Sequence, residues 1–218
     1  MQADADQALF ITFEGGEGAG KTTQISLLAE HIKKQYGAEV LVTREPGGTP
    51  EAEKIRDLLV KRDGGNWTAE AEILLLFAAR HMHVENVIKP ALAQGKIVLC
   101  DRFTDSTRAY QSYGHGLDIG IIERINGVIL DGFEPDLTYI IDVPVKVGLQ
   151  RAGKRMDDSG SDEDRFESLD ISFHNKLHEG FLDIAAAHPE RCHIVDGLKD
   201  IEALSADIKD EFDNRYKK

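Results

Sequence analysis

A glycine-rich segment near the start of the chain carries its clearest chemical signal. Residues 15–22 read GGEGAGKT and directly follow the apolar run at residues 9–13. Gly15, Gly18 and Gly20 allow backbone N–H groups to point toward a bound anion, because glycine adopts conformations that side chains prohibit. This order of strand, glycine loop and helix is typical of a loop that binds polyphosphate. A glycine turn without a ligand is the alternative, but it does not require all these features together.

Two polar residues and a helix complete this segment. Lys21 is positioned to reach the β- and γ-phosphates of a nucleotide, and the hydroxyl of Thr22 to bind Mg²⁺. Apolar residues recur at helical spacing in residues 23–34, so a helix begins at the loop and its N-terminal dipole favours an anion. The sequence therefore predicts a site for a nucleotide polyphosphate together with Mg²⁺.

Further charged residues directly follow two later apolar runs. Arg44 comes after residues 40–43, and Asp101 and Arg102 come after residues 97–100. Two arginines beside a triphosphate exceed what one nucleotide needs for charge neutralisation, so they suggest a second substrate that carries phosphate. Each arginine alone is more commonly part of a solvated or helix-capping ion pair. Their shared position after successive strands favours the phosphate role.

The elements that must position these residues alternate along the chain. Apolar runs predict strands at residues 9–13, 40–43, 97–100, 137–143 and 193–195. Helical patterns lie between them, at residues 22–35, 51–60, 69–94, 119–130, 144–151, 168–188 and 201–216. Apolar strands separated by helices predict an α/β fold with a five-stranded parallel sheet flanked by helices. Ligands of such sheets gather at the carboxyl ends of the strands.

One segment differs in composition from the rest of this single predicted domain, which spans residues 1–218. Residues 154–164 are charged, contain Gly and Ser and include almost no apolar residue. Because such a segment contributes nothing to a core, we expect a mobile loop there.

The overall composition excludes several classes of protein. With 218 residues, 41% of them hydrophobic, the chain can bury one good core. Its 26 basic and 39 acidic residues give a net charge of −13, which argues against a nucleic-acid partner but not against a nucleotide site. Cys100 and Cys192 are too few for a disulfide framework or a thiolate zinc site.

The chain carries no predicted membrane or export segment. No apolar run approaches the roughly 18 residues of a membrane span, and residues 1–8 are polar and acidic, unlike a signal peptide. We therefore expect a cytoplasmic protein with no membrane partner and a disordered segment at residues 1–8.

Five motifs resemble those of bacterial-type thymidylate kinases, members of the P-loop nucleoside monophosphate kinases. They are FEGGEGAGKTT at 13–23, TREPGGT at 43–49, LFAAR at 76–80, DRF at 101–103 and STRAYQ at 106–111. The similarity extends from about Leu9 to the C-terminal helix. It implies a P-loop NTPase fold with a mobile lid and transfer of the γ-phosphoryl group of ATP to dTMP, giving dTDP and ADP for dTTP synthesis. It also implies Mg²⁺ as cofactor and a homodimer.

The resemblance assigns a set of residues to dTMP. It implies that Phe77 stacks on thymine, that Arg80 hydrogen-bonds its O4 and that Thr107 contacts its N3 edge. Tyr110 corresponds to the ring that crowds the sugar 2′ carbon, and Gln111 follows it in many members. The alternative for Phe77 is an ordinary core position, because apolar residues surround it in the sequence.

Other residues are assigned to phosphate and metal. The resemblance places Arg44 and Arg102 on the dTMP phosphate and Glu17 near the sugar 3′-hydroxyl. Asp101 and Thr22 would act on the metal, Asp101 directly or through water. Asp101 is equally compatible with a capping role at a strand-to-helix turn.

The catalytic arginine of the family lies either in the phosphate loop or in the lid. Gly18 and Ala19 occupy the loop positions here, so the cation must come from Arg151, Lys154 or Arg155 in a lid at residues 151–166. Arg155 is the leading candidate for the transferred phosphoryl group, and Arg151 for adenine and the ATP phosphates. The resulting catalytic set is Lys21, Asp101, Arg102 and Arg155. The ATP-binding set is Gly15, Gly16, Glu17, Gly18, Ala19, Gly20, Lys21, Thr22, Thr23 and Arg151.

Two rival functions share part of this pattern. A deoxynucleoside kinase has a phosphate loop and an Asp-Arg turn, but has less use for a second phosphate clamp such as Arg44. A regulatory nucleotide switch is disfavoured by the basic lid and by the lack of an Asn-Lys-x-Asp sequence that reads guanine.

Overall fold

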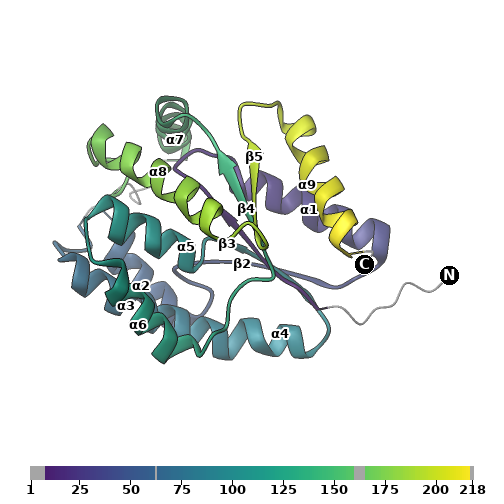
Figure 1. Ribbon diagram of the computed structural model, residues 1–218, viewed down its shortest axis with the longest axis horizontal. Helices are drawn as coiled ribbons and strands as arrows, with labels where there is room; N and C mark the ends of the chain where they lie inside the picture. The colour runs from purple at the N-terminus through teal and green to yellow at the C-terminus, as the bar shows by residue number, and fades with distance from the viewer. Residues whose placement is uncertain (1–7, 62, 160–164, 217–218) are drawn as a thin grey trace.

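A parallel sheet runs through the centre of the molecule (Figure 1). The computed structural model describes residues 8–61, 63–159 and 165–216. The sheet has five strands in the order β2-β3-β1-β4-β5, and all neighbouring strands are parallel. The strands are β1 (Phe10–Glu14), β2 (Val40–Arg44), β3 (Ile97–Asp101), β4 (Leu137–Asp142) and β5 (Cys192–Asp196).

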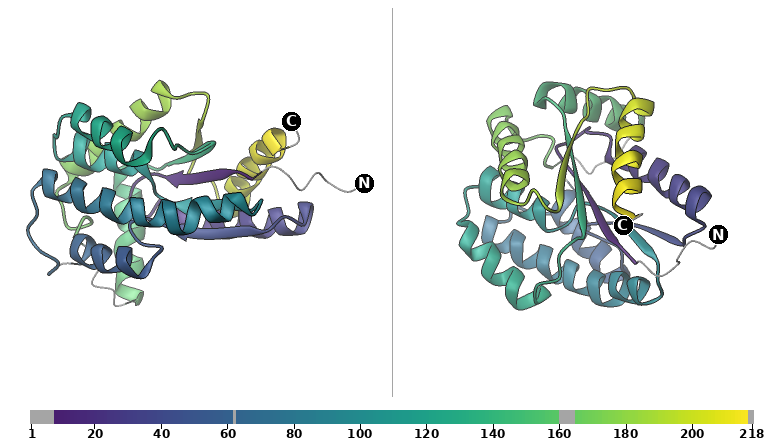
Figure 2. Two further views of the ribbon diagram at one scale, coloured as in Figure 1. Left: turned by 90° about the horizontal axis from the view of Figure 1, so that it is seen from below. Right: turned by 45° about the vertical axis from the view of Figure 1, so that its right-hand side comes forward.

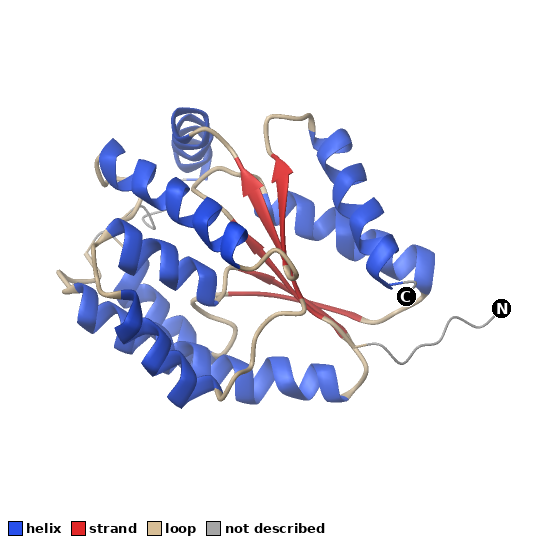
Figure 3. Cartoon of the chain, in the orientation of Figure 1, coloured by secondary structure: helices blue, strands red, loops and turns tan. Residues whose placement is uncertain are grey.

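Helices cover both faces of the sheet (Figure 3). They are α1 (Lys21–Tyr36), α2 (Pro50–Val60), α3 (Ala69–His83), η1 (Val84–Ile88), α4 (Lys89–Ala93), α5 (Thr104–Thr107), η2 (Arg108–Gly114), α6 (Ile119–Leu130), α7 (Val145–Ser159), α8 (Ile171–Ala187) and α9 (Ile201–Tyr216). Both η1 and η2 are π-helical turns. No helix in the described ranges is long and apolar enough to cross a membrane.

Local sequence signals set several helix ends. The side chain of Thr49 accepts a hydrogen bond from the backbone N–H of Ala52 and caps α2, and Pro50 occupies the first turn. Asp170 caps α8 in the same way. Gly37 ends α1 in the left-handed conformation that glycine adopts at little cost.

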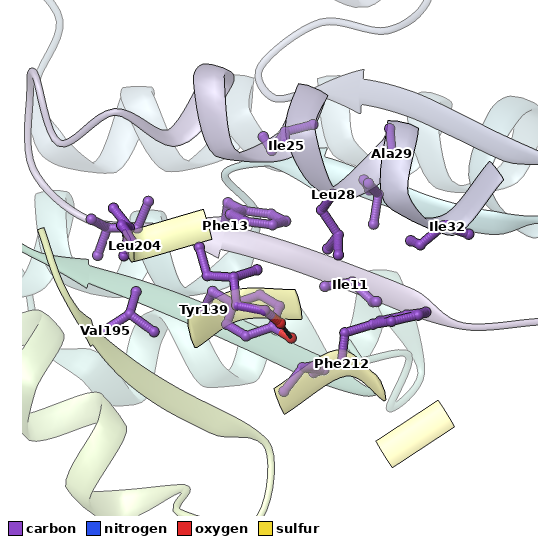
Figure 4. Close-up of a cluster of buried hydrophobic side chains, with 14 of the residues drawn as sticks. Ile11, Phe13, Ile25, Leu28, Ala29, Ile32, Tyr139, Val195, Leu204 and Phe212 are labelled. Carbon is purple, nitrogen blue, oxygen red and sulfur yellow. Dashed lines mark hydrogen bonds between the residues drawn. The ribbon is translucent and has the colours of Figure 1, made fainter. Parts of the chain in front are cut away.

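Alternate side chains of the central strands face opposite layers, as a pleated sheet requires. On one face Ile11 and Phe13 of β1 pack with Tyr139 of β4 against α1 and α9 (Figure 4). These two helices lie side by side (Figure 1). The central strands β1, β3 and β4 are almost wholly buried, whereas the edge strands β2 and β5 are partly exposed.

The other face carries two apolar clusters. Phe10 and Val98 pack against η1, α4 and the end of α6, while Ile140 packs against η2 and α8. Helix α3 contacts both α2 and α6, and the three form the outer part of this layer (Figure 2). The helices thus cover the faces of the sheet, and the loops that carry the predicted site lie at the carboxyl ends of the strands.

The predicted α/β fold is confirmed, and each of the five strands lies within one or two residues of its predicted range. The predicted helix 69–94 is a continuous helical segment in which the π-helical turn η1 lies between α3 and α4. The sequence did not indicate α5 and η2, whose residues 104–114 mix polar and small side chains.

The predicted mobile loop from residue 154 is wrong in its first part. Residues 154–159 continue helix α7 because Ala152 is buried and Met156 is partly buried one turn later, so the helix keeps an apolar side. Residues 160–164 of the predicted loop, and residues 1–7 of the predicted disordered start, lie outside the described residues.

A buried carboxylate connects the ends of two central strands. Glu14, the last residue of β1, is fully buried and accepts hydrogen bonds from the backbone N–H of Phe103 (2.7 Å) and the hydroxyl of Ser106 (2.5 Å). Burial and the negative charge of Asp105 raise the pKa of Glu14 from 4.5 to about 7, although its hydrogen bond from Ser106 opposes this change.

This raised pKa predicts a pH-dependent stability. The protonated carboxyl is favoured in the folded state, so its stabilisation is present below pH 4.5 and is lost as the pH rises through about 7. Glu14→Gln removes the titration. Between pH 5 and pH 8 the free energy of unfolding of wild type should therefore fall, relative to that of the variant, by on the order of 1–3 kcal/mol. Urea unfolding at both pH values measures this difference, and parallel stability profiles would contradict it.

Candidate active site

The loop after β1 has the conformation expected of a phosphate-binding loop. Gly15, Gly18 and Gly20 have φ angles of 130°, 64° and 95°, in the region that favours glycine. The Nζ of Lys21 lies 3.2 Å from the carbonyl oxygen of Gly15 and 3.1 Å from that of Gly16. The lysine thus folds back over the loop from the first turn of α1.

Gly18 is also required by close packing. A Cβ at this position would lie 2.1 Å from the carbonyl oxygen of Gly148 in α7. The loop and α7 therefore touch through their backbones. Because α7 carries Arg151 and Arg155, this contact brings the helix of both arginines against the loop.

Thr22 and Asp101 bring oxygen atoms together at the end of the loop. The Thr22 hydroxyl donates to Oδ2 of Asp101 across 3.0 Å. Hydroxyl and carboxylate oxygens are the hard donors that Mg²⁺ prefers, and it commonly takes only one or two of them from protein, with phosphates and water completing its shell. Among the described residues, no cluster of three acidic, histidine or cysteine side chains offers a metal site of its own. The pair fits Mg²⁺ carried in with a nucleotide.

Arg102 connects the loop to the opposite wall of the site. Its guanidinium donates to the Gly15 carbonyl (3.1 Å), to Glu17 (2.8 Å) and to the Ser106 hydroxyl (3.1 Å). It also lies over the ring of Tyr110, with its central carbon 5.0 Å from the ring centre. Its φ of 69° is uncommon for a residue with a side chain and marks a conformation that the surrounding contacts hold in place.

The charges around Glu17 are strongly coupled. Burial raises the pKa of Glu17, but the positive charges of Arg102 and Lys21 outweigh burial and bring the pKa down to about 2. The hydroxyl of Tyr110 donates to the same carboxylate. For Lys21, burial and the charge of Arg102 lower the pKa. Glu17 is therefore ionised at neutral pH and lies between two cations.

A cavity of about 800 Å³ extends from the phosphate loop to helix α3. It brings together most of the predicted site residues: Glu17, Gly18, Ala19, Gly20, Lys21, Thr22, Thr23, Arg44, Arg80, Asp101, Arg102, Thr107, Tyr110, Gln111, Arg151 and Arg155. Gly15 and Gly16 belong to the same loop but are not on the cavity wall. A cavity of this size is sufficient for small-molecule ligands.

Phe77 is the predicted site residue that the structure places elsewhere. It is 1% exposed and packs in the core with Ile73, Leu117 and Ile122, so it does not line the cavity. Leu76, one residue earlier on α3, lines the cavity instead. One residue turns a helix by about 100°, so the neighbouring positions face different surroundings. This placement corrects the expected stacking of Phe77 on a base.

Arg80 and Gln111 are buried in the cavity wall. Arg80 is 2% exposed, and its NH1 group has no hydrogen-bond partner among the described residues. Gln111 donates to Glu72 across 2.9 Å, and its Oε1 is likewise unpartnered. Polar groups buried without partners are costly, so these two are candidates for contact with a ligand.

The predicted arginines at the cavity mouth are more exposed. Arg44 donates to Glu53 of α2 across 3.0 Å and its side chain is 54% exposed. Arg151 donates to the Gly197 carbonyl (3.1 Å), and Arg155 lies 3.6 Å from Glu167 with 61% of its side chain exposed. Lys154 is exposed and is not on the cavity wall.

Several residues of the site were not among the predicted site residues, although Glu14 and Glu45 lie within the motifs at 13–23 and 43–49. Glu14 holds the loop after β3, and Glu45 pairs with Arg80. Glu72 contacts Gln111 and also accepts from Arg165, whose guanidinium donates to the Leu59 carbonyl at the end of α2. The π-helical turn η2, which carries Tyr110 and Gln111, was not predicted either, and such turns often occur at functional sites.

Comparisons with known proteins agree with this geometry. The family model described as thymidylate kinase matches residues 13–208. The thymidylate kinase of Geotalea uraniireducens is 50% identical over 91% of this chain and 93% of that protein. That of Caulobacter vibrioides is 48% identical over 94% and 95%. The crystal structure of thymidylate kinase from Ehrlichia chaffeensis superposes with a TM-score of 0.76 at 40% identity, and covers 94% of this chain and 98% of that one.

Three findings lead to one assignment: a phosphate loop, an arginine that connects this loop to the opposite wall of the cavity, and matches over most of the chain. The chain belongs to the thymidylate kinase family, the phosphotransferases of nucleotide biosynthesis that phosphorylate dTMP to dTDP with ATP.

Proposed function

We propose that the cavity binds ATP at the phosphate loop and dTMP at the end closed by Arg80, Thr107 and Gln111. The observation that carries this assignment is the continuity of the cavity, which joins Lys21 to the buried NH1 of Arg80, a group that no described residue pairs. Thymine O4 is a hydrogen-bond acceptor of the kind that this NH1 lacks. Cytosine has an amino group at that position, so a hydrogen-bond donor of the base would face the donor NH1 of Arg80.

The catalytic roles follow from where charge develops. Phosphoryl transfer needs little covalent chemistry from the protein, and depends on aligning the acceptor phosphate with the γ-phosphorus and on stabilising negative charge. Lys21 lies over the phosphate loop, where the donor phosphates would bind, and Arg102 lies between that loop and the part of the cavity assigned to the acceptor. Thr22 and Asp101 would hold Mg²⁺, which neutralises charge on the β- and γ-phosphates when bound.

We take the remaining acceptor contacts from the family resemblance. Arg44 and Arg102 clamp the dTMP phosphate, Glu17 faces the sugar 3′-hydroxyl, and Tyr110 lies against the sugar 2′ carbon. Support comes from the ring of Tyr110, which is 6% exposed and packed between Arg102 and Phe166. A rigid aromatic wall of this kind would disfavour an added 2′-hydroxyl.

We assign residues 151–166 to a lid over the ATP phosphates, of which residues 160–164 lie outside the described structure. Arg155 would reach the transferred phosphoryl group, and Arg151 the adenine and phosphates. Support comes from their places on the cavity wall and from the absence of a basic side chain at Gly18 and Ala19. Closure of such a lid would exclude water that otherwise hydrolyses ATP.

We also propose a homodimer and a cytoplasmic location, as the family resemblance and the sequence imply. Helices α3 and α6 pack against each other, and they expose Leu74 (62%) and Val128 (81%). Exposed apolar side chains on two adjoining helices support a contact with a second copy of the chain.

Substrate selection tests the assignment directly. With ATP and Mg²⁺, ADP should form rapidly with dTMP, much more slowly with dUMP and negligibly with dCMP or thymidine. Coupled ADP release over this panel is the measurement, and Lys21→Ala, expected to lower kcat by on the order of 10² or more, is the control for the site. Equal rates with thymidine and dTMP would overturn the monophosphate assignment.

Two arginine variants separate base recognition from phosphate alignment. Arg80→Ala should cost roughly 1–3 kcal/mol, mostly as a higher KM for dTMP, because a base acceptor loses its donor. Arg102→Ala should also lower kcat, because a misplaced acceptor phosphate spoils in-line attack. Steady-state kinetics with each substrate varied distinguishes the two. If both variants changed only the KM for ATP, neither residue would belong to the acceptor site.

The lid arginines differ in their expected effects. Arg155→Ala should lower kcat at least about tenfold, equivalent to roughly 1.4 kcal/mol of transition-state stabilisation. Arg151→Ala should mainly raise the KM for ATP. Lys146→Ala, an exposed basic residue of the same helix, serves as the matched control. Unchanged kcat in Arg151→Ala, Lys154→Ala and Arg155→Ala would mean that the missing cation comes from elsewhere.

A further inference from the structure

The guanidinium of Arg80 is fixed on every side except one. Its Nε donates to Oε2 of Glu45 across 2.6 Å, and its NH2 donates to the Phe103 carbonyl (3.1 Å) and the Thr107 hydroxyl (3.0 Å). The rings of Phe77 and Phe103 lie 5.0 Å and 5.1 Å from its central carbon. Only NH1 has no partner among the described residues, and Arg80 lines the cavity.

Glu45 is itself oriented by a second buried residue. The other oxygen of its carboxylate, Oε1, lies 3.0 Å from Nδ1 of His83, which is completely buried. Nε2 of His83 lies 2.7 Å from the hydroxyl of Thr43. A neutral His83 satisfies both contacts when Nδ1–H donates to Glu45 and Nε2 accepts from Thr43. The four residues form one relay, Thr43-His83-Glu45-Arg80, between β2 and α3.

The glycines after Glu45 leave room for this relay. Gly48 has a φ of 87°, and a Cβ there would lie 2.3 Å from the His83 ring. The loop therefore closes over His83 only because residue 48 is glycine. Glu53 of α2 also holds this loop, because its carboxylate accepts hydrogen bonds from the Gly48 N–H (3.0 Å) and from Arg44.

We propose that His83 and Glu45 are positioning residues for base recognition. They fix the direction of the Arg80 guanidinium so that NH1 meets an oxygen acceptor, and they thereby select a pyrimidine monophosphate with a 4-oxo group over one with a 4-amino group. Without them Arg80 would keep only the contacts of its NH2 and of the two rings, so its NH1 would be held less firmly and would discriminate less between the two bases. This inference rests on the proposed binding of dTMP beside Arg80.

The test compares three substitutions of His83 in the full-length enzyme. His83→Leu removes both contacts, His83→Asn keeps a donor near the place of Nδ1, and His83→Gln keeps a polar group near the place of Nε2. His81→Gln, an exposed histidine of the same helix, is the matched control. Kinetics with dTMP, dCMP and ATP gives each KM and the ratio of kcat/KM for dTMP to that for dCMP.

We expect His83→Leu to raise the KM for dTMP and to lower the dTMP to dCMP ratio, each by about fivefold or more, with the KM for ATP within about twofold of wild type. His83→Asn should recover most of the loss and His83→Gln less, because the contact with Glu45 is the one that orients Arg80. His81→Gln should match wild type. Thermal unfolding establishes that each variant is folded.

Three results would overturn the proposal. The first is a folded His83→Leu enzyme with the wild-type KM for dTMP and the wild-type dTMP to dCMP ratio. The second is an equal rise in the KM values for ATP and dTMP. The third is a His83→Asn variant that recovers no more of the loss than His83→Gln. If His83→Leu does not fold, two other measurements decide. One is the comparison of His83→Asn with His83→Gln, and the other is the kinetics of Thr43→Val, a near-isosteric variant that removes the hydroxyl contact with His83. A failure of the proposed function itself would differ, because wild type would then lack dTMP phosphorylation or Arg80→Ala would leave dTMP kinetics unchanged.

Discussion

The contact of Arg102 with the phosphate loop is the interaction on which the site depends. Phe13 on β1 pairs with Asp101 on β3, and the backbone N–H of Arg102 continues this ladder by donating to the Phe13 carbonyl across 3.0 Å. Parallel pairing of adjacent strands therefore places the loop after β1 beside the loop after β3. The guanidinium then spans from the Gly15 carbonyl to the Ser106 hydroxyl, so a single side chain connects the phosphate loop with α5.

The parts of the fold that local patterns determine were predicted from the sequence. Apolar runs between helices gave the five parallel strands, and the fixed spacing of residues 15–22 gave the phosphate loop. Arg44 and Arg102 could be placed at the cavity because residues that end neighbouring parallel strands must meet at one edge. These inferences need only sequence neighbours and the geometry of a sheet.

Features that depend on distant partners were not predicted. Leu76 and Phe77 are both apolar, and only tertiary packing shows which of them faces the cavity. Glu45 lies within the motif at 43–49, but its role was not predicted because its partners Arg80 and His83 are 35 and 38 residues away. The extent of α7 was underestimated because charged residues beyond residue 151 resemble a loop in composition, although they continue a helix.

We propose that one continuous cavity holds both nucleotides with their phosphates in line. A ligand in which adenosine and thymidine are joined 5′ to 5′ through five phosphates tests this arrangement. Isothermal titration calorimetry and competition against each substrate should show a ligand displaced by both ATP and dTMP, and bound more tightly than either, because its second half binds intramolecularly. Displacement by ATP alone, with an affinity no greater than that of ATP, would contradict the claim.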